Sequence, residues 1–70
     1  MGMRPDDPVV EFEVTDPVEL ESEKAIRVKV EGEWMWIPKG HISEDSDVQG
    51  EGDTGTLIIS EWIATEKELI

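Results

Sequence analysis

The 70-residue chain contains no cysteine, so neither a disulfide framework nor a thiolate zinc site can hold its fold. It also has no tyrosine, a single phenylalanine and a single histidine. A domain of this length buries only about 60% of the surface of its unfolded chain. Stability must therefore come from one small, well-packed apolar core. The absence of cysteine leaves the redox compartment of the protein open.

Long apolar segments are missing as well. The longest apolar run has four residues, Trp34 to Ile37, whereas about 20 are needed to cross a bilayer. The N-terminal sequence MGMRPDDPVV has no apolar signal-peptide core. We therefore expect a cytoplasmic protein with no membrane partner.

Basic residues are few and unevenly placed. The chain has 6 Lys and Arg against 18 Asp and Glu, a formal net charge of −12. Four of the basic residues lie in residues 24–39, whereas residues 5–23 and 40–66 have none. Such a charge opposes direct binding to nucleic acid and to anionic membranes. High net charge is also typical of disorder, but the apolar residues here are patterned, which favours a fold.

Groups that carry catalysis are sparse. His41 is the only histidine, no serine lies in a G-x-S-x-G setting, and there is neither a P-loop nor a G-x-G-x-x-G motif. Acid–base catalysis by carboxylates needs two of them in contrasting environments within a cleft, which a domain of this size seldom forms. We therefore expect no enzymatic activity and no cofactor, and a structural role in a turn for His41.

One segment follows the first half of a calcium-binding loop. In DSDVQGEGDTGT, residues 45–56, Gly50 takes the sixth place. Oxygen ligands stand at alternating positions: Asp45, Asp47, Gln49, Glu51 and Asp53. The twelfth place, where a bidentate glutamate is required, is Thr56, and no flanking helices are predicted. We expect no tight calcium site, and at most weak binding of divalent ions.

Apolar and polar residues alternate with a period of two, which is typical of half-buried strands. Alternation predicts strands at VVEFEV (9–14) and AIRVKV (25–30). A hairpin turn at Gly32 leads into a third strand, EWMWIP (33–38), which Pro38 ends, and the β-branched segment GTLIIS (55–60), bounded by Gly55 and Ser60, predicts a fourth. The intervening HISEDSDVQGEGD indicates a loop or a short 3-10 turn. SEWIATEKELI predicts a short helix with Ser60 as N-cap, Glu61 in the first turn and Lys67 in the last.

These elements predict a mainly β fold, either a small antiparallel sheet or an SH3-like or OB-like barrel. We expect about four to five strands and a short C-terminal helix. A single β-rich domain would cover residues 9–70, and residues 1–8 would form a flexible N-terminal arm.

The length of one turn decides where two tryptophans lie. If Glu31 and Gly32 form a two-residue hairpin loop, Trp34 and Trp36 lie on the outer face beside basic side chains. A three-residue loop turns both rings into the core. Because other large side chains are scarce, we favour a core or half-core position for Trp36 and leave Trp34 open. We expect Trp36 and Trp62 to be needed for folding.

A resemblance involves residues 24–64. The run EWMWIPKGHISEDSDV, followed by GDTGTLIISEWIA, resembles a family of short, mostly uncharacterised proteins of phages and mobile elements. The residues that match are Trp36, Ile37, Pro38, Lys39, Ile42, Asp45, Ser46, Gly52, Asp53, Gly55, Ser60, Trp62 and Ile63. Gly40 and His41 depart from the Ser-Gln pair expected after the lysine. The resemblance implies a fold and a host-cell location, and says little about chemistry.

Size and charge are similar by type to DNA-mimic inhibitors, which include anti-CRISPR and anti-restriction proteins. A 70-residue globule is roughly 28 Å across, a length of duplex DNA that carries about 16 phosphate charges. Glu11 and Glu13 would lie about 6.7 Å apart on a strand, close to the spacing of neighbouring phosphates. The resemblance implies a monomeric, non-enzymatic phage-type inhibitor that binds a nucleic-acid-binding complex, such as a CRISPR effector, in the host cytoplasm.

The residues expected to contact this partner are Glu11, Glu13, Glu31, Glu33, Trp34, Glu44, Asp45, Asp47, Glu51 and Asp53. The alternative function is that of a phage accessory protein, which would bind a partner through the hairpin that carries Trp34 and Trp36, without mimicry. The third alternative is an acidic domain fused or bound to a larger host enzyme. The simpler explanation of the charge itself is solvation, because charged outer faces keep a small β domain soluble.

Overall fold

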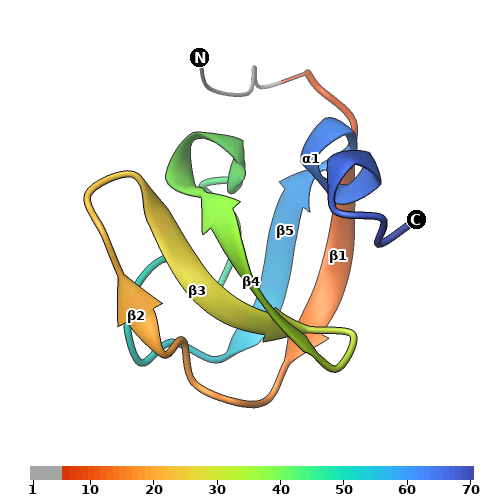
Figure 1. The fold of residues 1–70 in the computed structure, drawn as a ribbon. Helices are drawn as coiled ribbons and strands as arrows, with labels where there is room; N and C mark the ends of the chain where they lie inside the picture. The colour runs from red at the N-terminus through yellow and green to blue at the C-terminus, as the bar shows by residue number, and fades with distance from the viewer. Residues whose placement is uncertain (1–5) are drawn as a thin grey trace.

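Residues 6–70 fold into five strands, one 3-10 helix and one α-helix (Figure 1). The computed structural model describes residues 6–70, so that most of the predicted N-terminal arm lies outside the described residues. The elements are β1 (Val9–Val14), β2 (Leu20–Glu21), β3 (Ala25–Val30), β4 (Glu33–Pro38), the 3-10 helix η1 (Lys39–His41), β5 (Gly55–Ser60) and α1 (Glu61–Glu66).

The strands form two small antiparallel sheets, β1–β5 and β2–β3–β4 (Figure 1). The prediction of a mainly β fold with a short C-terminal helix is confirmed. Within residues 6–70 the two sheets stay separate and do not close into a barrel. The four predicted strands are confirmed as β1, β3, β4 and β5, whereas β2, with two residues, is too short to show a period.

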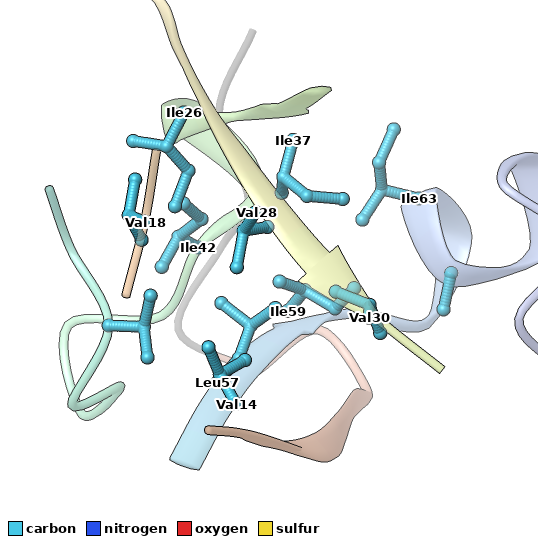
Figure 2. Close-up of a cluster of buried hydrophobic side chains, with 12 residues drawn as sticks. Val14, Val18, Ile26, Val28, Val30, Ile37, Ile42, Leu57, Ile59 and Ile63 are labelled. Atoms are coloured by element: carbon cyan, nitrogen blue, oxygen red, sulfur yellow. The ribbon is translucent and has the colours of Figure 1, made fainter. Parts of the chain in front are cut away.

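The core lies between the two sheets and is almost entirely aliphatic (Figure 2). Its buried members are Val14, Val18, Ile26, Val28, Val30, Ile37, Ile42, Val48, Leu57, Ile59, Ile63 and Ala64. Val10, Phe12, Met35 and Leu69 pack against this cluster and are partly buried. Branched side chains therefore fill the interior, and no tryptophan is needed there.

A two-residue turn joins β3 to β4. Glu31 and Gly32 have φ values of 53° and 84°, the left-handed backbone that a type I′ hairpin loop requires. This turn pairs Arg27 with Trp36 and Lys29 with Trp34. Trp36 is 39% exposed and lies on the outer face, so the expectation of a core or half-core position is wrong. With a two-residue loop, the inward positions of β4 are occupied by Met35 and Ile37.

The helix begins as predicted but buries different residues. The Ser60 Oγ accepts a hydrogen bond from the Ile63 N–H at 3.1 Å, which confirms the N-cap. Lys67 is the C-cap residue and lies just beyond the last turn. Trp62 is 59% exposed, while Ile63 and Ala64 face the core. Trp62 therefore lies outside the core, and burial gives no support to the expectation that it is needed for folding.

The long connection from η1 to β5 runs along the free edge of β5. Ile42 pairs with Ile59, and the Asp47 N–H donates to the Thr56 carbonyl at 2.9 Å. Val48 is fully buried and fixes the middle of the connection. β5 thus lies between β1 and residues 42–48. Within residues 6–70, no helix has the length and apolarity needed to span a bilayer.

Candidate functional site

Two carboxylates project outward from β1. In this strand Val10, Phe12 and Val14 face the core, so Glu11 and Glu13 are exposed on the opposite face of the sheet. Both side chains therefore lie beside β5, because Glu11 pairs with Ile58 and Glu13 pairs with Thr56.

Three more carboxylates lie on the other side of β5. Glu44, Asp45 and Asp47 are exposed in the segment that follows the free edge of this strand. Asp47 contacts Thr56, the same residue that pairs with Glu13. Neighbouring strands are about 4.8 Å apart, so where this segment bonds to β5 its backbone lies roughly 10 Å from that of β1. We call this set, Glu11, Glu13, Glu44, Asp45 and Asp47, the acidic sheet surface.

The basic side chains of the central hairpin lie elsewhere. Among the described residues, the ion pairs join Arg27 to Glu19 at 2.9 Å, Lys29 to Asp16 at 3.6 Å, and Lys39 to Glu21. No ion pair within residues 6–70 involves a carboxylate of the acidic sheet surface. Within the described part of the chain, no basic side chain therefore offsets the charge of this surface.

A second group of predicted residues lies at the β3–β4 hairpin. Glu31, Glu33 and Trp34 are all exposed there, and they belong to the other sheet. A groove of about 360 Å³ lies between this hairpin and the end of β1. Its lining includes Glu13 and Glu31. The groove therefore connects the acidic sheet surface with the residues of the hairpin, but the two groups do not form one continuous surface.

The last two predicted residues belong to a loop whose polar groups are used internally. The Asp53 Oδ2 accepts hydrogen bonds from the Gln49 N–H at 2.9 Å and the Gly50 N–H at 2.8 Å. These two donors lower the pKa of Asp53. The Glu51 N–H donates to Glu21, whose pKa is lowered first by its hydrogen bond with Lys39 and next by this N–H. Contact of Glu51 or Asp53 with a partner stays a prediction.

The oxygen groups of the calcium-like segment point to separate partners. Asp53 caps the turn at Gln49 and Gly50, and the Asp47 Oδ2 accepts from the Thr56 N–H at 3.2 Å. Gln49 donates its side-chain amide to the Ser43 and Ser46 carbonyls. In the described part of the chain, no three His, Asp or Glu side chains converge as metal ligands would.

The structure joins His41 and Ser60, which are 19 residues apart and share no motif that would have indicated their contact. The His41 Nδ1 lies 2.9 Å from the Ser60 Oγ, and the His41 ring stacks on Trp62 at 5.2 Å. Ser60 is only 3% exposed, and its Oγ already caps α1. A nucleophile needs an accessible oxygen. This pair therefore fixes η1 against α1, which agrees with a structural His41.

Acid is expected to loosen the loop of residues 49–53. Because the folded-state pKa of Asp53 is lowered, its contribution to stability is present above the unfolded-state pKa and is lost as pH falls through the folded-state pKa. The protection factor of the Gln49 and Gly50 amides, which compares their exchange with that of an unfolded peptide at the same pH, should fall as pH falls through that range. In Asp53→Asn the protection factor should already be lower at neutral pH and should change little with pH. Equal pH dependence in both proteins would contradict the assignment.

Comparison with known proteins adds no relative. The chain matches no protein-family model, no curated protein and no solved structure. The resemblance of residues 24–64 to phage proteins accordingly stays a prediction, and the functional argument rests on the surfaces described above.

Proposed function

We propose that the protein is a non-enzymatic inhibitor that occupies the nucleic-acid-binding site of a host defence complex, in the manner of an anti-CRISPR protein. The observation that carries this proposal is the acidic sheet surface, whose carboxylates lie on either side of β5 and form no ion pair within residues 6–70. The target would be a protein complex with a basic channel, and the inhibitor itself would not touch nucleic acid.

The density of charge supports the proposal. The described chain measures 28 × 24 × 18 Å and the protein carries a net charge of −12. Duplex DNA of the same 28 Å length carries about 16 negative charges. A basic channel built to attract DNA would therefore attract this domain with a comparable field, which also accelerates association.

The spacing of the carboxylates supports it as well. Glu11 and Glu13 are two residues apart on one strand, a distance of about 6.7 Å. The backbone segments on the two sides of β5 are roughly 10 Å apart where both bond to this strand, which falls between the widths of the minor and major grooves of DNA, about 6 and 12 Å. Basic side chains arranged for two phosphate strands would thus find carboxylates at similar separations.

Neutralising the acidic sheet surface is expected to abolish inhibition. The variant would replace its glutamates with glutamine and its aspartates with asparagine, so that the Asp47 position keeps an oxygen for the Thr56 N–H. Five charge contacts at about 0.2–1 kcal/mol each correspond to a loss of affinity of about 5- to 4000-fold. The measurement is capture of a CRISPR surveillance complex from a bacterial lysate, with DNA competition at two salt concentrations.

A matched control distinguishes the effect of the acidic sheet surface on binding from the effect of net charge. Neutralising five exposed carboxylates outside this surface also lowers the net charge from −12 to −7; the set is Asp6, Glu23, Glu61, Glu66 and Glu68. The control should retain most of the affinity, and DNA and high salt should both reverse capture of the unmodified protein. Equal loss in both variants, or capture that neither DNA nor salt disturbs, would refute the proposal.

A further inference from the structure

β4 lies at the edge of the three-stranded sheet, whose order is β2–β3–β4. Val30 and Glu33 flank the two-residue turn and are therefore a hydrogen-bonded pair. Hydrogen-bonded pairs recur at every second residue, so that Met35 and Ile37 also bond to β3. The N–H and C=O groups of Trp34 and Trp36 consequently point away from β3. Among residues 6–70, no other backbone group pairs with them.

The same edge displays apolar side chains on its outer face. Trp34 is 37% exposed, and Trp36 is 39% exposed. The register continues the row from Trp36 through Arg27 to Leu20, which is 49% exposed. Soluble proteins usually protect an edge strand with charges, proline or a bulge. On β4, Glu33 and Pro38 protect only the two ends, and the middle of the strand presents free backbone groups beside two indole rings.

The basic groups on this face are already neutralised. Arg27 and Lys29 lie beside the tryptophans, but their charges are paired with Glu19 and Asp16 from the connection between β1 and β2. The net charge of the whole molecule therefore determines the sign of the charge expected on the partner. A net charge of −12 repels a second copy of the chain and attracts a basic segment. Exposed indole faces also bind the cations of Arg and Lys.

We propose that the edge of β4 binds an extended, basic segment of a partner protein, which adds as an antiparallel strand to the β2–β3–β4 sheet. Backbone hydrogen bonds to Trp34 and Trp36 would supply affinity, as in other cases of strand addition. Residues opposite the tryptophans share their outer face, so arginines at alternate positions lie over the indoles. This surface lies on the other sheet from the acidic sheet surface and does not depend on its role.

The test uses a synthetic peptide of about eight residues, one strand in length, in which arginine and valine alternate. Two versions of equal charge are N-methylated, one on the arginine nitrogens and one on the valine nitrogens. When the peptide adds to β4 with its arginines opposite the tryptophans, only the arginine N–H groups donate hydrogen bonds to the edge of β4. At about 0.15 M salt the arginine-methylated peptide should bind at least about tenfold more weakly than the valine-methylated one. Amide NMR signals of Trp34 and Trp36 should shift with the active peptide.

Protein variants complete the test. Replacing Trp34 and Trp36 together with threonine, which keeps the strand propensity, should weaken peptide binding by at least about tenfold. The control Trp62→Ala, which removes an exposed tryptophan on α1, should leave binding unchanged. The variant of the acidic sheet surface should keep the difference between the two methylated peptides, which distinguishes a failure here from a failure of the proposed function.

Four results would overturn the inference. The first is equal binding of the two methylated peptides, because that indicates charge attraction alone. The second is a set of shifts on Glu11 and Glu13 in place of the β4 residues. The third is concentration-dependent self-association that broadens the Trp34 and Trp36 signals, which would assign the edge to a second copy. The fourth is the absence of measurable peptide binding.

Discussion

Replacing Ile37 with alanine is expected to lower the free energy of unfolding by about 2–5 kcal/mol, whereas Trp36→Ala should cost about 1 kcal/mol or less. Ile37 is fully buried in the aliphatic core, so its loss removes apolar burial and leaves a cavity (Figure 2). The Trp36 side chain lies on the outer face and is 39% exposed. The larger side chain is therefore the less important one for stability.

Urea denaturation of both variants, followed by circular dichroism, measures this difference directly. A small domain has about 5–15 kcal/mol of stability, so Ile37→Ala should shift the midpoint strongly. Met35→Ala, at a partly buried position of the same strand face, should fall between the two. A Trp36 variant less stable than the Ile37 variant would mean that the register of β4 is displaced by one residue, because such a slip exchanges the two faces.

The sequence was sufficient to predict four of the five strands and insufficient to orient β4. Alternation gives the bounds of β1 and β3, the turn before Glu33 and the stop at Pro38 give those of β4, and a β-branched run between Gly55 and Ser60 gives those of β5. Both faces of β4 carry apolar residues, so the alternation does not say which is inward. The choice depends on whether the turn has two or three residues, and Glu31 adopts positive φ although it is not glycine. The small number of other large side chains therefore gave a wrong prediction for the position of Trp36.

The candidate site was likewise only partly predictable. Exposure of Glu11 and Glu13 follows from the alternation in β1. That residues 42–48 return along β5, opposite β1, depends on contacts such as Ile42 with Ile59, which are distant in the sequence and leave no local pattern. The charged residues of two segments consequently form one surface that neither segment predicts by itself.

Ser46 shows how this surface is held, and its replacement by alanine is expected to cost about 2–4 kcal/mol. The hydroxyl is 6% exposed and accepts hydrogen bonds from the Val48 N–H at 3.2 Å and the Ile58 N–H at 3.1 Å. Its own proton is donated to the carbonyl of Val48 or Thr56. Without this oxygen, two shielded N–H groups lose their partner, and each such loss costs about 1–3 kcal/mol.

Ser22→Ala provides a matched control, because the Ser22 hydroxyl also bonds to nearby backbone groups but is exposed. Water replaces those bonds, so the cost should be below about 1 kcal/mol. Urea denaturation gives the stabilities, and hydrogen exchange at Val48 and Ile58 shows whether the segment detaches from β5. Equal costs for the two serines would show that burial of Ser46 is unimportant. A larger cost at Ser46, with faster exchange there, would make this hydroxyl the link that keeps Asp45 and Asp47 beside the carboxylates of β1.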